Sequence, residues 1–202
     1  TLLLGVHAHQ PVGNFPEVIE DAHQRCYKPF LEILHAYPDF RFASHFSGWL
    51  LDWLRERHPA DMDLLARMVR RGQVELFSSG DTEPVLAAIP QRDRVGQLAT
   101  LNAKLAAWTD VTAHGAWLTE RVWESSVVPA LVATGIRYVT VDDYHFFCTG
   151  KAANELDGFF STEEDGQRLD LFPISEALRY RLPFSPAHEV VGYLENLADQ
   201  GH

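Results

Sequence analysis

The feature that most constrains the fold is an alternation of short β-type runs with longer stretches of helical periodicity along the chain. Six runs are predicted as strands: residues 2–9, 41–46, 74–78, 113–119, 138–141 and 169–173. Strands that alternate with helices favour parallel β-α-β units over a sandwich. Polar residues collect after each predicted strand, which is typical of a barrel. We therefore predict an α/β fold with a parallel barrel of βα units.

The stretches between these runs have helical periodicity. The predicted helices are residues 19–36, 48–57, 60–71, 91–108, 128–134 and 187–198. Pro59 separates the second helix from the third, because proline cannot continue a helix interior. Residues 150–167 are polar and contain glycine, so we expect a loop insertion there. No linker marks an internal boundary, and we expect residues 1–202 to form one unit.

Composition limits the classes of partner. The sequence has 17 Lys and Arg against 28 Asp and Glu, a formal charge of −11, which argues against a nucleic-acid surface. No stretch approaches the roughly 18 to 20 apolar residues of a membrane span, and the first residues do not resemble a signal peptide. The two cysteines, Cys26 and Cys148, have no CxxC spacing. We therefore expect a soluble, cytoplasmic protein with no nucleic-acid or membrane partner.

Two histidines end the first predicted strand. Residues two apart on a strand point to the same face, so His7 and His9 project together, and Pro11 stops the strand. In a βα barrel, chemistry occurs at this end of the strands. Paired imidazoles can bind a metal ion or form hydrogen bonds with a polar ligand such as a sugar. They can equally be two satisfied histidines in a polar pocket.

An acidic residue follows the third predicted strand. Gly80 permits a sharp exit from the strand, and Glu83 precedes a proline, which favours an extended conformation. Glu83 is therefore a candidate for the same rim as the two histidines. The alternative is a solvated loop acid with no function.

The fourth predicted strand ends in a carboxylate among aromatic residues. Glu120 lies between Trp117 and Trp123 and beside Arg121, a pattern typical of sugar sites, where aromatic faces stack on pyranose rings and a carboxylate attacks the anomeric carbon. Glu120 could instead simply pair with Arg121. Glu124 fits the first turn of the following helix, where negative charge is favourable.

Two adjacent acids, Asp142 and Asp143, follow the fifth predicted strand. Two buried carboxylates side by side would repel each other. We therefore expect one to face the cleft and the other to face solvent or cap a turn. The sequence does not distinguish which.

Taken together, these segments resemble glycoside hydrolase family 57, most closely its 4-α-glucanotransferase and α-amylase members. The likeness covers nearly the whole chain. The matching stretches are His7-Ala8-His9-Gln10-Pro11, Gly72-Gln73-Val74-Glu75-Leu76, residues 80–84, Trp117-Leu118-Thr119-Glu120, Val141-Asp142-Asp143-Tyr144-His145-Phe146, Leu171-Phe172-Pro173-Ile174, Leu178-Arg179-Tyr180 and Pro183-Phe184.

The resemblance implies the N-terminal part of an incomplete, seven-stranded (β/α) barrel whose final strands lie outside this chain. It implies cleavage or transfer of α-1,4-linked glucan with retention of anomeric configuration, without a metal ion or other cofactor. By similarity Glu120 matches the family's nucleophile. His7, His9, Glu83 and Trp117 match the donor-sugar subsite, and Asp142 and Asp143 are further candidate substrate-binding residues.

The family's general acid is an aspartate in a later Asp-Asp-Gly-Glu motif, and residues 1–202 contain no such motif. We therefore assign the acid to no residue of this chain, and expect the 202-residue piece alone to be inactive. Two other functions remain open. One is a metal-dependent deacetylase or mannosidase-like barrel, in which His7 and His9 join acids such as Asp142. The other is a glucan-binding module without activity. The sequence does not distinguish hydrolysis from transfer, nor does it indicate the oligomeric state.

Overall fold

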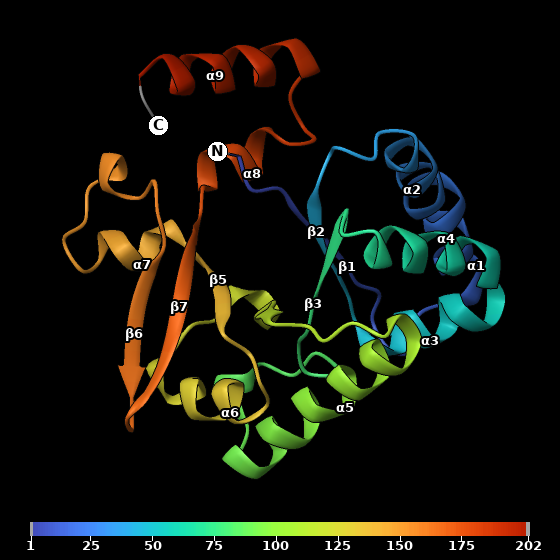
Figure 1. The fold of residues 1–202 in the computed structure, drawn as a ribbon, viewed down its shortest axis with the longest axis horizontal. Helices are drawn as coiled ribbons and strands as arrows, with labels where there is room; N and C mark the ends of the chain where they lie inside the picture. Colours follow the sequence, from blue (N-terminus) through green and yellow to red (C-terminus); the bar gives the residue numbers. More distant parts are fainter. Residues whose placement is uncertain (1, 201–202) are drawn as a thin grey trace.

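The computed structural model describes residues 2–200, and its strands follow the predicted order with one addition (Figure 1). The strands are β1 (Gly5–Ala8), β2 (Phe42–Phe46), β3 (Val74–Phe77), β4 (Gly115–Ala116), β5 (Tyr138–Asp142), β6 (Phe160–Glu164) and β7 (Gln167–Ile174). The first three strands form one parallel sheet, and the others form a second sheet in the order β4-β5-β7-β6. Only β6 runs antiparallel to its neighbour.

Helices connect the strands. They are α1 (Pro16–Ala22), α2 (Lys28–His35), α3 (Gly48–Arg57), α4 (Pro59–Arg70), α5 (Gln91–Thr109), α6 (Val128–Ala133), α7 (Asp143–Phe147), α8 (Glu176–Arg181) and α9 (Ala187–Asp199). The π-helix η1 (His23–Tyr27) joins α1 to α2, and four 3-10 turns complete the set: η2 (Leu86–Ala88), η3 (Thr119–Arg121), η4 (Ser125–Val127) and η5 (Ala153–Glu155). Within residues 2–200, none of the helices has both the length and the apolar character that crossing a bilayer requires.

In the described part of the chain, one isolated backbone bridge joins the two sheets. Ser78, directly after β3, pairs with Ala116 of β4 in parallel. The Ser78 amide donates to the Gly115 carbonyl at 2.9 Å, and the Trp117 amide donates to the Ser78 carbonyl at 2.8 Å. The strands thus form one arc from β1 to the edge strand β6, with α1 to α4 gathered on the side of β1–β3 that faces away from β5–β7 (Figure 1). This arc is the predicted incomplete barrel.

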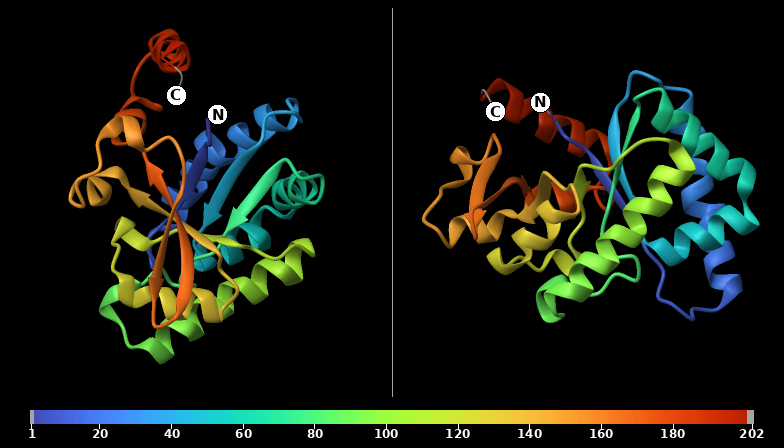
Figure 2. Two further views of the ribbon diagram at one scale, coloured as in Figure 1. Left: turned by 60° about the vertical axis from the view of Figure 1, so that its left-hand side comes forward. Right: turned by 60° about the horizontal axis from the view of Figure 1, so that its bottom comes forward.

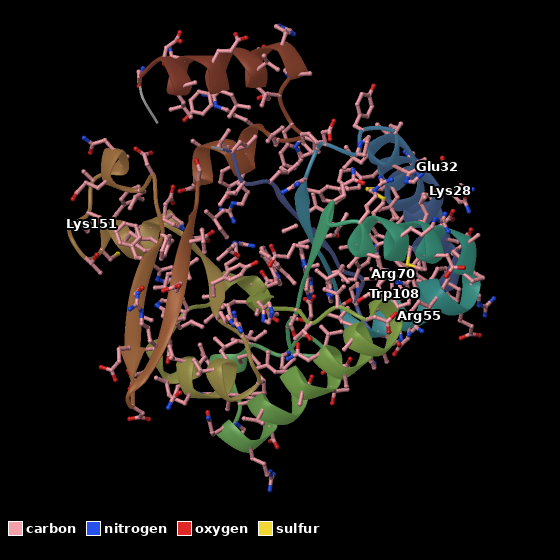
Figure 3. All side chains as sticks on the ribbon, in the orientation of Figure 1. Lys28, Glu32, Arg55, Arg70, Trp108 and Lys151 are labelled. Carbon is pink, nitrogen blue, oxygen red and sulfur yellow. The ribbon has the colours of Figure 1, made fainter. Side chains whose placement is uncertain are left out.

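Two hydrophobic cores lie between the arc and its helices, one behind β1–β3 and one behind β4–β7. Helix α5 contributes to both, because Leu98 packs in the second core while Leu101 and Leu105 pack in the first. Figure 2 shows the long α5 helix running along both halves of the molecule. The guanidinium of Arg70 on α4 donates to the carbonyls of Trp108 and Thr109, which closes the C-terminal end of α5 (Figure 3). Helix α5 therefore packs against both halves and supports the backbone bridge between them.

The inner face of the arc carries polar and aromatic residues. Along β5, Val139 and Val141 are buried against helices, whereas Tyr138 and Asp142 lie on the opposite face. The Tyr138 hydroxyl donates to the Glu75 carboxylate of β3 across this inner face. Because side chains alternate between faces along a strand, the inner face receives every second residue. The functional candidates described below lie at the end of this face where the parallel strands finish.

The predicted loop at residues 150–167 is wrong for residues 160–164, which form β6. Strands β6 and β7 make an antiparallel hairpin whose two turn residues, Asp165 and Gly166, both have positive φ, 52° and 72°. An Asp-Gly pair is a strong signal for this turn, because its twist matches that of the flanking strands. The strand was not predicted because the segment is mostly polar and shows no alternation of apolar and polar residues.

Other elements also differ from the sequence prediction. The helix expected at residues 19–36 is interrupted by η1, and the strand expected at 113–119 keeps only two residues, Gly115–Ala116. The chain leaves the ladder after Ala116 and turns through η3. The short helices α7 and α8 were not predicted. Helices of five and six residues carry too few apolar positions to show a period.

Substituting Gly115 by alanine should destabilise the fold. An added Cβ would lie 2.4 Å from the Tyr138 ring, which packs edge-on against Phe77 and Phe172 and cannot withdraw freely. We expect a loss on the order of 1–3 kcal/mol in urea unfolding. Gly96, inside α5, has nothing within 4 Å of an added Cβ. The matched variant Gly96→Ala should therefore gain about 0.5–1 kcal/mol. Equal stability of the two variants would contradict this account.

Candidate functional site

The parallel register of β1 and β2 positions the first two groups. His7 and His45 are register partners, so their side chains emerge side by side on the inner face. Their Nδ1 atoms lie 2.7 Å apart, within hydrogen-bond distance, and their rings are stacked at 4.9 Å. His45 is buried, whereas His7 is partly exposed. One of the two Nδ1 atoms must carry a proton and the other must accept it.

A serine on the next loop determines which nitrogen carries the proton. Ser79 Oγ donates to the Gly80 carbonyl at 2.9 Å and also lies 2.8 Å from His45 Nε2. A hydroxyl has one proton, so His45 Nε2–H must donate to Ser79 for both bonds to form. His45 Nδ1 is then the acceptor and His7 Nδ1 the donor. Only this arrangement makes all three hydrogen bonds, and it leaves a lone pair on His7 Nε2.

Glu83 lies among three imidazoles. Its Oε2 is 3.3 Å from His9 Nδ1, and its Oε1 is 3.5 Å from His45 Nδ1 and 3.9 Å from His7 Nδ1. Only 4% of its side chain is exposed, so the alternative of a solvated loop acid is wrong. Its backbone has φ of 53°, a left-handed conformation that is uncommon for a residue other than glycine. The loop from Gly80 to Pro84 thus turns this carboxyl inward.

Burial determines the charges in this group. It raises the pKa of Glu83 to about 7, with a smaller contribution from the charge of Glu120. Burial, then His9 and Arg121, lowers the pKa of His7 to about 4, and burial lowers that of His45 well below its usual value. His7 and His45 are therefore uncharged at neutral pH, and their contacts with Glu83 are close polar contacts rather than full ion pairs.

Trp117 forms one wall of the site. The bridge at Ser78 places it beside the histidines, and its ring stacks on that of His7 at 4.5 Å with an interplanar angle of 18°. Its Nε1 is buried and has no partner among the described protein atoms. The indole therefore combines an apolar ring with a free donor, which is a combination that a partly apolar, hydroxyl-bearing ligand can use.

Glu120 occupies strained backbone at the rim. Glu120 and Arg121 are consecutive residues with φ of 53° and 57°. Such conformations cost on the order of 1–3 kcal/mol each and cluster at functional sites. The Glu120 side chain makes no hydrogen bond or ion pair with any residue in the range 2–200. Burial lowers the pKa of His9 and the charge of Glu120 partly offsets this, whereas for Glu83 the charge of Glu120 adds to the rise in pKa caused by burial. The alternative in which it pairs with Arg121 is wrong, because Arg121 Nε donates to Asp142 Oδ2 at 3.1 Å.

The two adjacent acids have different surroundings. Asp142 lies between Arg121 and Arg179, whose nearest atom is 3.7 Å from Asp142 Oδ1, so it belongs to the rim of the site. The backbone amide of Glu176, the first residue of α8, donates a hydrogen bond to Asp143 Oδ2 at 3.0 Å. Asp143 is therefore engaged at the start of a helix, and it forms no hydrogen bond or ion pair with Glu120.

Unpartnered buried polar atoms gather at this end of the strands. They are Ser47 Oγ, Ser78 Oγ, Glu83 Oε1, Trp117 Nε1, Thr119 Oγ1, Thr140 Oγ1 and Asp142 Oδ1. Buried polar groups in proteins are nearly always hydrogen-bonded, so each of these calls for a partner. A ligand rich in hydroxyl groups can supply such partners.

The same residues include a possible metal-ligand set. His7, His45 and Glu83 each offer a ligand atom, and the three atoms lie within 4.8 Å of one another. Two imidazoles and a carboxylate form the protein ligand set of some hydrolytic zinc sites. Nitrogens bound to one tetrahedral zinc ion would stand about 3.3 Å apart, given zinc–nitrogen distances near 2.05 Å. The observed 2.7 Å fits a shared proton better than a shared metal ion.

Sequence reasoning missed three residues of the site: His45, Ser79 and Arg179. His45 ends the second strand as His7 ends the first, and the rule that barrel chemistry lies at strand ends would have found it. Ser79 and Arg179 carry no such signal, because their positions depend on contacts between distant segments.

One family profile matches nearly the whole chain. The family profile described as "Glycosyl hydrolase family 57" matches residues 3–202. The chain is 47% identical to an "Alpha-amylase" of Pyrococcus abyssi and 46% identical to a "4-alpha-glucanotransferase" of Thermococcus kodakarensis, in each case over 98% of this chain. It spans about 30% of the length of these curated relatives.

A solved structure has the same fold. The crystal structure of 4-alpha-glucanotransferase from Thermococcus litoralis superposes with a TM-score of 0.92 at 46% identity. The match covers 96% of this chain and 30% of that one. The arc of parallel strands is therefore the N-terminal part of a larger catalytic fold in that relative.

Replacing Glu83 by glutamine should change the pH dependence of stability. The pKa of Glu83 is raised to about 7 by burial, so its stabilising contribution is complete below the unfolded pKa and is lost as pH rises through 7. The neutral variant lacks this loss. Relative to wild type, Glu83→Gln should gain on the order of 1–3 kcal/mol between pH 5 and pH 8 in urea unfolding. The exposed control Glu124→Gln should show no such trend. An identical difference at both pH values would disprove the burial effect.

Proposed function

Because the chain belongs to glycosyl hydrolase family 57, we propose that the whole protein is a retaining enzyme that cleaves or transfers α-1,4-linked glucans, with Glu120 as nucleophile. The observation that carries the proposal is the position of Glu120. It is an exposed carboxylate without a hydrogen-bond partner among residues 2–200, held by left-handed backbone next to the histidine group. The names of the relatives, alpha-amylase and 4-alpha-glucanotransferase, give the substrate class.

In this proposal Glu120 attacks the anomeric carbon, and a glycosyl-enzyme intermediate forms as the glycosidic bond breaks. A retaining pair needs a second carboxyl about 5–5.5 Å away to protonate the leaving oxygen. Glu83 has a raised pKa, but its side chain is 4% exposed and faces three imidazoles, so it is poorly placed to reach a leaving group. We propose that the acid is an aspartate outside residues 1–202, in the Asp-Asp-Gly-Glu motif of the family.

The other candidate residues have proposed roles in binding and positioning the donor sugar. We propose that His7 and His9 form hydrogen bonds with hydroxyl groups of the donor sugar, and that Trp117 forms the wall against which it rests. Glu83 would hold the imidazoles, since both of its oxygens face them. Asp142 would position Arg121 behind the nucleophile. The Asp143 carboxylate accepts a hydrogen bond from a backbone amide of α8. We therefore propose that Asp143 affects substrate binding indirectly, by holding the neighbouring segments in place.

The central test is Glu120→Gln in the full-length protein. Loss of the nucleophile should lower turnover of maltooligosaccharides by about 10³-fold or more. The matched control is Glu124→Gln, an exposed acid four residues along, which should keep nearly all activity. A role as nucleophile further predicts that Glu120→Ala regains turnover with azide and forms a glycosyl azide. Substantial activity of Glu120→Gln would rule out the assignment. Sugar binding by wild type without any turnover would instead support a binding module.

The products formed from maltotriose decide between hydrolysis and transfer. Both reactions share the glycosyl-enzyme intermediate and differ in whether water or a sugar hydroxyl reacts with it. Longer oligosaccharides would indicate transfer, whereas glucose and maltose alone would indicate hydrolysis. Product analysis by chromatography over the first few turnovers separates the two.

A second candidate function is supported by the ligand set of His7, His45 and Glu83, which suits a metal-dependent hydrolase acting on carbohydrate. The short distance between the histidine nitrogens disfavours it. In that case activity should disappear on removal of divalent metal ions with a chelator and return on addition of zinc. A retaining mechanism through Glu120 should be unaffected by the chelator.

We also propose a cytoplasmic location. Cys26 and Cys148 are free and exposed, which suits a reducing compartment. Fractionation of cells that express the full-length protein tests this location directly.

A further inference from the structure

A second group of histidines and carboxylates lies on the helices that cover β1–β3. Glu20 and His23 stand where α1 meets η1, and His58 and Asp61 stand where α3 meets α4. His23 Nε2 lies 2.9 Å from Asp61 Oδ2, and His58 Nε2 lies 2.8 Å from Glu20 Oε2. The rings of His23 and His58 stack with centroids 3.8 Å apart. These four residues form what we call the helix cluster.

Local structure brings these side chains together. His23 is the first residue of the π-helix, and π-helical segments occur frequently at functional sites. His58 precedes Pro59 at the start of α4, and Asp61 lies in the first turn of that helix. The two segments are 38 residues apart in the sequence, so the cluster is a long-range contact. It connects the first helices of the chain to α4.

The helix cluster has an excess of negative charge. Each carboxylate faces an imidazole, and neither Glu20 nor Asp61 forms an ion pair with a lysine or arginine of residues 2–200. His23 is fully buried, and its Nδ1 has no hydrogen-bond partner among the described atoms. The two imidazole–carboxylate pairs, His23 with Asp61 and His58 with Glu20, each satisfy one ring nitrogen. Stacking two such pairs face to face concentrates four metal-ligating groups in one place.

We propose that the helix cluster binds a divalent transition metal ion of the zinc class, with His23, His58 and Asp61 as ligands and Glu20 as the fourth. Ligand atoms of the first three residues lie within 4.8 Å of one another. Around tetrahedral zinc they would stand about 3.3 Å apart. The ion would therefore replace the shared protons of the His23–Asp61 contact at 2.9 Å and the His58–Glu20 contact at 2.8 Å, and both contacts would widen. The side chains of His58 and Asp61 are partly exposed, 15% and 19%, so they can move inward and leave a path for the ion.

The chemistry of the ligands selects the ion. Imidazole favours zinc and its neighbours among the transition metals, whereas magnesium and calcium prefer sites made of oxygen atoms. Four protein ligands would leave no open position for a substrate, which is the pattern of a structural zinc site rather than a catalytic one. Bound zinc would thus fasten α1 and η1 to the start of α4 without taking part in the reaction proposed for Glu120.

Titration of the metal-free, full-length protein with zinc chloride tests the proposal. Wild type should bind zinc and gain several degrees in Tm, because a ligand that binds only the folded state stabilises it. Magnesium should have no such effect. His58→Gln and Asp61→Asn, both partly exposed, should weaken zinc binding at least tenfold and lose the zinc-dependent rise in Tm. A purely structural role of these residues would lower Tm but leave its response to zinc unchanged.

Two matched controls separate this site from other sources of zinc binding. Asp21→Asn removes a neighbouring exposed carboxylate that pairs with Arg25, and it should bind zinc as wild type does. Glu83→Gln removes the carboxylate of the other possible ligand set, and it should also retain binding. Zinc binding that survives in both His58→Gln and Asp61→Asn, or that is lost in Glu83→Gln alone, would overturn the proposal. Absence of zinc binding in wild type would do so too.

Discussion

The bridge between Ser78 and Ala116 is the contact on which the arrangement of the site depends. Two backbone hydrogen bonds connect the sheet of three strands to the sheet of four. Among the described residues, β3 and β4 form no further ladder with each other. One side of the bridge leads into Ser79 and the loop of Glu83. The other leads directly into Trp117 and the turn of Glu120. Both halves of the candidate site therefore begin within a few residues of one parallel contact.

This arrangement places strained backbone and a buried carboxyl at the rim, and both occur at residues that we propose have roles in the site. Glu83 and Glu120 both have left-handed backbone, and Glu83 is also buried with a raised pKa. A chain selected only for stability would place glycine at such turns and a neutral residue inside. The cores behind the strands, by contrast, are packed with buried leucine and valine. The packed cores between the strands and the outer helices supply stability, whereas the residues at the rim of the inner face reduce it.

Much of the fold followed from local periodicity, since the order of strands and helices needs only the pattern of nearby residues. His7, His9 and Trp117 could be predicted to meet because barrel strands end on one edge. The contact of His7 with His45 could not, because it depends on the register between two strands. Two further features, the burial of Glu83 and the presence of the π-helix, could not be predicted from the sequence either. The first depends on three distant imidazoles, and the second depends on one extra residue per turn within an ordinary helical pattern.

The proton arrangement set by Ser79 has a consequence for which ligand groups His7 can recognise. His7 donates its Nδ1 proton to His45, so its remaining nitrogen offers only a lone pair. A ligand group that meets this nitrogen must bring its own hydrogen. A free hydroxyl qualifies, but a methyl ether, a fluorine or a carbonyl oxygen at the same position would face it lone pair to lone pair. A serine hydroxyl two steps away thus selects the polarity of a ligand that it never touches.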